Sequence, residues 1–200
     1  MTPDPVLDAA KSALRLEARR RRKALQVDHP EADWMIADRL GELVAALRLR
    51  PGVAALYRSL GSEIDPRPLG EALMRNGWRL ALPAVVDVDG PLEFRAWAPG
   101  DRLAHDLAGL PAPLDNAPAT SPGLIVLPLL AFDQRGGRLG QGGGYYDRTL
   151  AALRGRARPP AFVGLAYAGQ QVEAVPHGPH DQPLDGILTE AGYTAARKDP

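Results

Sequence analysis

The fold is decided by the stretch from Leu124 to Leu150, which reads LIVLPLLAFDQRGGRLGQGGGYYDRTL. Its first part predicts a buried strand, because Ile, Val and Leu follow one another without a polar break. A loop follows with glycine at positions 136, 137, 140, 142, 143 and 144, and helical signals begin after Asp147. A glycine-rich turn between a strand and a helix can direct backbone N–H groups at a phosphate, and the helix dipole adds partial positive charge. We therefore interpret the stretch as a phosphate-binding loop.

Arginines around this loop support the interpretation. Arg135, Arg138 and Arg148 supply formal positive charge, although glycine clusters also occur in flexible surface connections. Neither standard nucleotide fingerprint is present: no Gly-Lys-Ser/Thr follows the glycines, and Tyr145 stands where a dinucleotide-binding fold has its third glycine. The residues alone indicate a phosphate loop of neither standard type.

The same residues carry a family resemblance. Residues 138–147, Arg-Leu-Gly-Gln-Gly-Gly-Gly-Tyr-Tyr-Asp, follow Leu-Pro-Leu-Leu-Ala-Phe-Asp, and together they resemble the signature of the 5-formyltetrahydrofolate cyclo-ligase family, also called 5,10-methenyltetrahydrofolate synthetases. Further segments that resemble the family extend over nearly the whole chain. One residue departs from the pattern, since Gln141 stands where the family usually has arginine.

The composition is that of an ordinary globular protein. Two hundred residues, 45% of them hydrophobic and 24% charged, suit one domain spanning residues 1–200. A net charge of zero gives no global field towards nucleic acid or membrane, and the absence of cysteine excludes disulfides and thiol nucleophiles. Residues 1–8 lack a signal pattern, and no apolar run reaches the length of a membrane span. We expect a cytoplasmic monomer with no nucleic-acid or membrane partner.

A long first helix is predicted from Asp4, as its cap, to about Gln26. Leu7, Leu14, Ala18 and Leu25 form its apolar face. Beside that face lies a row of basic residues, which we call the basic stripe of the first helix: Lys11, Arg15, Arg19 and Arg22.

The basic stripe has two interpretations. Like charges on one face repel each other, so an anionic partner would be stabilising. For residues 19–23 we favour a solvated face whose long side chains cover apolar surface. Lys11-Ser-Ala-Leu-Arg15 resembles the amino-terminal motif in which the family's lysine and arginine contact ATP phosphates.

The remaining pattern predicts α/β architecture. A second helix is expected over 31–50, with Trp34, Ala37, Leu40, Val44 and Leu47 facing the core. A strand over 53–57, a helix started by Asp65 and Pro66, and a strand over 78–85 form a parallel crossover. Further strands are expected over 92–97, 161–167 and 186–189, with a short helix or turn over 170–175 and an irregular connection or lid over 99–122. The expected fold class is α/β: a single-domain, three-layer α/β/α structure with a mostly parallel twisted sheet and its site at the carboxyl ends of the strands.

Three further groups of residues are candidates for the site or for the core. Ser-Glu63-Ile-Asp resembles the family segment whose glutamate contacts the folate, and Arg58 opens the same loop as a second substrate-binding candidate. Trp97 could wall a folate pocket, but we favour core packing. His177 and His180 beside Asp181 could suggest zinc, but with no cysteine and no third compact ligand we favour a surface loop.

The resemblance implies ATP- and magnesium-dependent conversion of 5-formyltetrahydrofolate to 5,10-methenyltetrahydrofolate, with release of ADP and phosphate. It assigns Arg138 and Tyr145 to catalysis, and Arg58, Glu63 and Tyr145 to the folate. The ATP-binding residues would be Lys11, Arg15, Arg138, Leu139, Gly140, Gln141, Gly142, Gly143, Gly144, Tyr145 and Tyr146, and Asp147 and Asp185 would bind magnesium. The residues leave two alternatives open: a sugar-phosphate isomerase-like enzyme with the same phosphate loop, and a non-catalytic nucleotide- or RNA-binding module using the arginines of the first helix.

Overall fold

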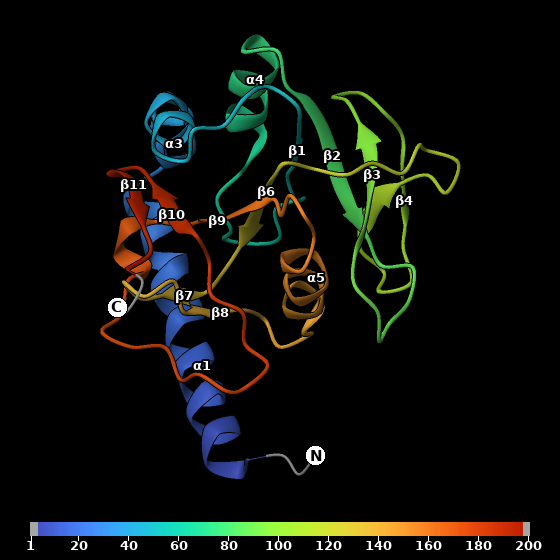
Figure 1. Cartoon of the computed structure of the whole chain (residues 1–200). Helices are drawn as coiled ribbons and strands as arrows, with labels where there is room; N and C mark the ends of the chain where they lie inside the picture. Colours follow the sequence, from blue (N-terminus) through green and yellow to red (C-terminus); the bar gives the residue numbers. More distant parts are fainter. Residues whose placement is uncertain (1–3, 198–200) are drawn as a thin grey trace.

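Seven strands form one twisted sheet in the computed structural model, which describes residues 4–197 (Figure 1). The strand order is β11-β10-β9-β6-β1-β2-β3. The bounds are β1 Val53–Ala55, β2 Arg79–Ala84, β3 Glu93–Trp97, β6 Leu124–Pro128, β9 Ala161–Leu165, β10 Gly186–Thr189 and β11 Gly192–Ala195. The five middle strands pair in parallel, and only the edge strands β3 and β11 pair antiparallel to their neighbours. The predicted mostly parallel sheet is confirmed. Residues 1–3 and 198–200 lie outside the described part. The predictions about a signal pattern over residues 1–8 and about one domain over residues 1–200 include these residues.

Helices cover both faces of the sheet, which confirms the three layers. Successive side chains of a strand point to opposite faces. In β6, Leu124 and Val126 therefore pack with α2 (Ala32–Asp38), α3 (Leu40–Ala46) and α4 (Arg67–Arg75), whereas Ile125 and Leu127 pack with α5 (Tyr145–Arg154). All four β6 side chains are fully buried, so the central strand holds the two outer layers together.

The first helix, α1, begins as predicted and runs over Pro5–Asp28. The Asp4 carboxylate accepts hydrogen bonds from the backbone N–H groups of Val6 and Leu7, and Pro5 occupies the first turn. Ala18 packs in a small cluster with residues of the segment after β6, and Leu25 packs against the main core. The helix therefore packs on the segment after β6, and its C-terminal end reaches the main core (Figure 1). Within residues 4–197, no helix combines the length and the apolar character needed to cross a membrane.

The single helix predicted over 31–50 is wrong, because α2 and α3 are separated at Arg39. The Arg39 N–H bonds the carbonyl of Ile36, three residues back, and this tighter turn rotates the next helix. Ala37 and Leu40 are buried as expected, but Trp34 is 56% exposed, and Ile36 and Leu43 are fully buried instead. The helix predicted from Pro66 begins one residue later, although Asp65 does accept a hydrogen bond from the Arg67 N–H.

Short hairpins were missed in the irregular segments. Within 99–122, β4 (Leu103–His105) pairs with β5 (Pro111–Pro113), and within the glycine-rich stretch β7 (Ala131–Phe132) pairs with β8 (Arg138–Leu139). The short helix or turn expected over 170–175 is misplaced: a 3-10 helix, η1, lies at Ala168–Gln170, and residues 171–175 are not helical. Strands of two or three residues have too little periodicity to be recognised in a sequence.

Candidate active site

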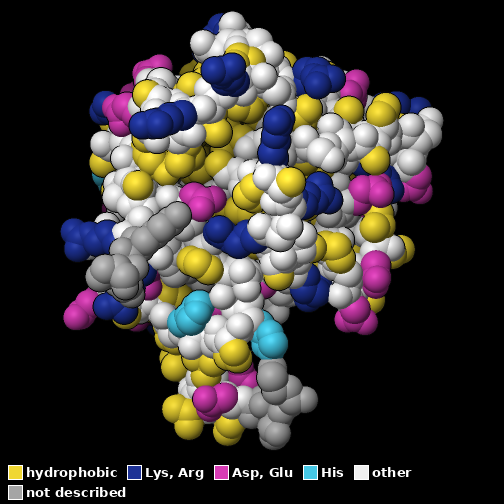
Figure 2. Space-filling model, viewed as in Figure 1, with side chains coloured by type: hydrophobic (Ala, Val, Ile, Leu, Met, Phe, Trp, Pro, Cys, Tyr) yellow, Lys and Arg dark blue, Asp and Glu magenta, His cyan; other side chains and the backbone are white. Residues whose placement is uncertain are grey.

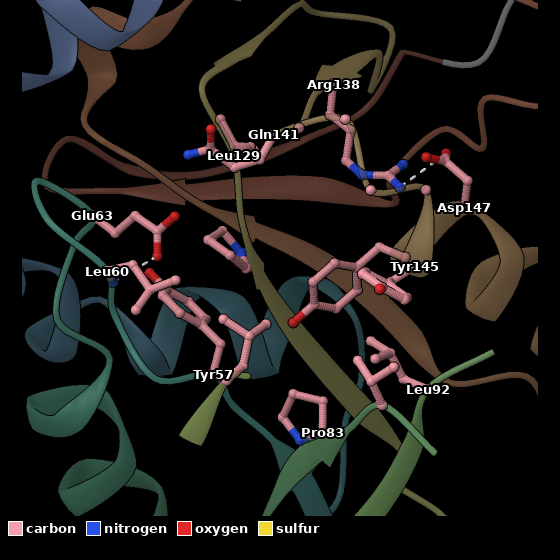
Figure 3. A pocket seen from close by; sticks show the side chains of 18 of the residues that line it. Tyr57, Leu60, Glu63, Pro83, Leu92, Leu129, Arg138, Gln141, Tyr145 and Asp147 are labelled. Carbon is pink, nitrogen blue, oxygen red and sulfur yellow. Dashed lines mark hydrogen bonds and ion pairs between the residues drawn. The ribbon is translucent and has the colours of Figure 1, made fainter. Parts of the chain in front are cut away.

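A cavity of about 310 Å³ opens at the carboxyl ends of β1, β2 and β6 (Figure 3). Tyr57 follows β1, Val85 follows β2 and Leu129 follows β6, and all three line it. Ligands of open parallel sheets bind at this edge, because the loops after neighbouring strands diverge there. The cavity has the size of a small-molecule site. The cavity therefore lies at the edge of the sheet where the sequence predicts the site.

Only the second half of the predicted phosphate loop reaches the cavity. Residues 138–147 all line it, but Gly136 and Gly137 belong to the turn of the β7–β8 hairpin. That turn is fixed by the carboxylate of Asp133, which accepts hydrogen bonds from the N–H groups of Arg135 and Gly137. The loop thus begins at Arg138. Arg135 was expected beside the phosphate loop, but it does not line the cavity.

The glycine loop ends at the N-terminus of α5. Gly142 has φ +109° and Gly144 has φ +68°, in the left-handed region that other residues rarely adopt. Gly144 is the N-cap of α5, so the N–H groups of Tyr145, Tyr146 and Asp147 lack partners within the helix. These donors lie at the cavity and suit an anion.

Arg138 is anchored at the start of the loop. Its guanidinium donates to the carbonyl of Gln182 at 2.5 Å and to Asp147 Oδ1 at 2.9 Å, and the backbone N–H of Gln182 donates to the same Asp147 oxygen at 3.0 Å. The side chain is 5% exposed. This arrangement fixes a cation and a carboxylate side by side on one wall of the cavity.

The basic stripe of α1 meets the loops around the cavity. Lys11 lines the cavity and pairs with Asp181 at 2.5 Å, and Arg15 donates to the carbonyl of Gly140 at 3.0 Å. Burial alone would raise the pKa of Asp181, but the hydrogen bonds from Lys11 and from the Gly178 N–H outweigh it, and the pKa lies below its usual value. A phosphate entering here would compete with Asp181 for Lys11.

The opposite side of the cavity holds a buried carboxylate, that of Glu63, which is 7% exposed. In Figure 3 it lies across the cavity from Arg138 and Asp147. Its Oε2 accepts a hydrogen bond from the Leu60 N–H at 2.9 Å. Burial, and then the nearby Glu63 charge, raise the pKa of Tyr146 far above its usual value while Arg138 opposes them, so this phenol remains a protonated donor. Arg58 and Tyr145 also line the cavity, as expected for substrate-binding residues.

Two interpretations of arginines need correction. Arg22 was expected on a solvated face but is 5% exposed and pairs with Glu63 at 3.3 Å. Arg148 was expected to add charge to the phosphate loop. Instead it donates to the carbonyls of Gly90 and Val88, and its guanidinium lies 4.9 Å from the centre of the Tyr145 ring.

Asp185 and Trp97 lie outside the set of residues that line the cavity. One Asp185 oxygen accepts a hydrogen bond from the Phe162 N–H at 2.8 Å, and the other pairs with Arg154 at 3.5 Å. The structure therefore does not bring Asp185 into the cavity with Asp147. Trp97 packs against the main core, as expected.

Sequence reasoning missed several lining residues. Asp106 and Leu110 come from the β4–β5 hairpin, in a segment without a recognisable pattern. Asp181 was visible only as part of a His-Asp segment and had been considered for zinc rather than for pairing with Lys11. Long-range ion pairs of this kind leave no trace in local spacing.

Comparison with known proteins identifies one family. The sequence profile of the 5-formyltetrahydrofolate cyclo-ligase family matches residues 8–190. The 5-formyltetrahydrofolate cyclo-ligase of Escherichia coli K12 is 36% identical over 140 residues, which cover 68% of this chain and 76% of the relative. That of Mycolicibacterium smegmatis is 30% identical over 169 residues, or 80% of this chain and 86% of the relative.

Solved structures give the same result. The 5,10-methenyltetrahydrofolate synthetase of Aquifex aeolicus has a TM-score of 0.73 and 26% identity, and the match covers 95% of this chain and 94% of that one. The enzyme from Mycoplasma pneumoniae has a TM-score of 0.67 and 25% identity, with 90% and 98% covered. The family profile, the curated relatives and the solved structures agree, and the chain belongs to the 5-formyltetrahydrofolate cyclo-ligase family.

Proposed function

We propose that this protein converts 5-formyltetrahydrofolate to 5,10-methenyltetrahydrofolate and couples the ring closure to conversion of ATP to ADP and phosphate. The observation that carries the proposal is the polarity of the cavity. Cationic side chains and helix N–H groups form one wall, and the buried carboxylate of Glu63 lies opposite them. Such a cavity has room for a phosphorylated ligand and a second ligand rich in N–H donors.

The chemistry needs this combination. The formyl oxygen is a poor leaving group, so the γ-phosphoryl group is first transferred to it and ADP leaves. The 10-nitrogen of the folate then attacks the activated carbon and releases its proton to water, and the C–O bond breaks with departure of phosphate. Both steps require alignment and charge neutralisation more than a covalent nucleophile.

Lys11, Arg15 and Arg138 would bind the phosphates, together with the backbone N–H groups of residues 139–146. Arg138 touches the reacting end of ATP in this scheme and is its main catalytic cation. Arg15 lies against the loop rather than in the cavity wall, so it would act from behind Gly140 and Gly142. The paired Arg138–Asp147 geometry favours a fixed orientation of the phosphate group.

Glu63, Arg58 and Tyr145 would bind the folate. A carboxylate accepts two parallel N–H bonds, which suits the amide and amino edge of the pterin. Tyr145 lies at the start of α5, between the phosphate loop and the folate end, and would hold the formyl-bearing part of the substrate close to ATP.

Magnesium suits this site as the counter-ion of ATP. Among residues 4–197 no group of three His, Cys, Asp or Glu side chains could hold a metal by itself, but Mg²⁺ bound to a nucleotide needs only one or two carboxylates besides phosphates and water. Asp147 is the carboxylate that fits, because it lines the cavity beside Arg138. Bound magnesium would neutralise phosphate charge. The role predicted for Asp185 requires its carboxylate to leave Phe162 and Arg154.

Mixing the protein with magnesium-ATP and 5-formyltetrahydrofolate should produce the ultraviolet absorbance of the methenyl compound, with one ADP formed for each product. Methenyl-folate formed without ATP consumption, or ATP consumption at a rate that does not depend on the folate, would contradict the proposal.

Two other results would favour the alternatives: isomerisation of sugar phosphates, or RNA binding without turnover. On the face shown in Figure 2, basic side chains are interspersed with acidic and apolar ones, which does not favour RNA. We infer that the enzyme acts as a cytoplasmic monomer of one domain, and gel filtration tests its oligomeric state.

A further inference from the structure

Arg22 is the buried member of the basic stripe of α1, and it joins this helix to the 58–65 loop and to the end of β6. Its Nε donates to Ser62 Oγ at 3.1 Å. One terminal nitrogen donates both to Glu63 Oε1 and to the carbonyl of Leu129, each at 3.3 Å. Arg22 itself is not among the residues that line the cavity, whereas Glu63 and Leu129 are. Any effect of Arg22 on a ligand therefore passes through its partners.

The ion pair is buried on both sides. The side chains of Arg22 and Glu63 are 6% and 5% exposed. Removing one partner of such a pair leaves an uncompensated charge away from water, which is strongly unfavourable. The Glu63 carboxylate is thereby held in one place.

The contacts leave this carboxylate free to accept further hydrogen bonds. Arg22 occupies one acceptor position on Oε1, and the Leu60 N–H occupies one on Oε2. A carboxylate has about four acceptor positions in all, so each oxygen can accept one more N–H. Two N–H donors on one edge of a flat heterocycle match this arrangement.

We propose that Arg22 is a positioning residue for the folate: it fixes Glu63 so that both of its oxygens face the N–H groups of the pterin ring. The proposal rests on the function proposed above. The hydrogen bonds from Arg22 to Ser62 and to the carbonyl of Leu129 fix the guanidinium that holds Glu63.

Steady-state kinetics with each substrate varied in turn test this role. Arg22→Met should raise the KM for 5-formyltetrahydrofolate by about tenfold or more and change the KM for ATP by less than about twofold. Arg22→Lys keeps the charge and should restore part of the loss. Arg21→Met is the matched control, because Arg21 is exposed on the same helix, and it should behave as wild type.

A double-mutant cycle separates positioning from general stability. If Arg22 acts through Glu63, Arg22→Met should add less than about twofold to the folate KM in a Glu63→Gln protein. Equal rises in both KM values, or effects that multiply in the double variant, would overturn the proposal. The double variant carries no unpaired buried charge at this pair, and in Glu63→Gln the Arg22 guanidinium keeps Ser62, the Leu129 carbonyl and an amide oxygen as acceptors, so these two variants can be compared even if Arg22→Met alone does not fold. A wild-type protein without cyclo-ligase activity would instead contradict the proposed function.

Discussion

At the scale of single residues, Gln141 shows how a missing charge is compensated. The resemblance predicts arginine at this position, and the glutamine that replaces it accepts two hydrogen bonds from Arg19, at 3.1 and 2.9 Å. A guanidinium is therefore present beside the loop, but it comes from α1. Arg19 is exposed, as the sequence predicts, whereas Arg22 is buried.

The variant Gln141→Arg should lower the KM for ATP by about threefold. It places a second guanidinium beside that of Arg19, and a bound phosphate relieves the repulsion between them. The gain should shrink as salt is added, because both groups are exposed. The variant Arg19→Met/Gln141→Arg lacks the repulsion and should bind ATP much as the wild type does. A raised KM in the single variant would show that the Gln141 amide makes a contact that arginine cannot replace.

Substitutions of Asp147 and Asp185 should differ in their effect on the magnesium requirement. Asp147→Asn should raise the magnesium concentration at half-maximal rate by about tenfold, because asparagine keeps an acceptor for Arg138 and Gln182 but loses the charge that magnesium requires. Asp185→Asn should leave this midpoint unchanged, since Asp185 bonds Phe162 and Arg154 outside the cavity lining. Magnesium titration at saturating ATP and folate measures both. A shift with Asp185→Asn alone would reverse the assignment.

At the scale of elements, the start of α5 depends on the backbone of Gly144. Its φ of +68° is unfavourable for a residue with a Cβ, and an added Cβ would lie 2.7 Å from a terminal nitrogen of Arg148. Gly144→Ala should lower the free energy of unfolding by about 1–2 kcal/mol and raise the KM for ATP, because it turns the helix N–H groups away from the phosphates.

Gly140 provides the control for this prediction. An added Cβ there meets no atom within 4 Å, and its φ is not in the left-handed region. Gly140→Ala should therefore stay within about 0.5 kcal/mol of wild type in urea unfolding. Equal destabilisation by both substitutions would show that the loop has no special need for the Gly144 conformation.

The sequence predicted the elements that have a long apolar pattern or a clear capping signal at their ends. The buried run of β6, the Asp4–Pro5 helix start and the parallel crossover of β1 and β2 were all recovered, because each depends on local periodicity or capping. The break at Arg39 was not, since a change from α-helical to tighter bonding needs no glycine or proline. The burial of Arg22 was also missed, because its partners lie 40 to 107 residues away.

At the scale of the whole molecule, one ion pair joins α1 to a loop far along the chain. Lys11 and Asp181 are 170 positions apart. The pKa of Asp181 is lowered in the folded state, so the unfolded chain takes up the proton first as the pH falls. The stabilising contribution is complete above the ordinary aspartate pKa and is lost as the pH falls through the lower, folded-state value.

Asp181→Asn should remove this contribution. The difference in unfolding free energy between wild type and variant should be about 1 kcal/mol and constant from about pH 5 to 7, and it should shrink below about pH 4. Urea unfolding across this range measures it. A difference that persists unchanged at pH 3 would mean that Asp181 stabilises the fold by its shape or neutral hydrogen bonds rather than by its charge.

The basic stripe of α1 also constrains the order in which the chain acquires its structure. Arg22 meets Glu63 41 positions later, Arg15 meets Gly140 after 125, and Lys11 meets Asp181 after 170. A ribosome therefore releases α1 long before its final partner exists, and closing such large loops in the chain slows folding. Because Glu63, Gly140 and Asp181 are synthesised in that order, the contacts of α1 can form only in stages, from its C-terminal end towards its N-terminus.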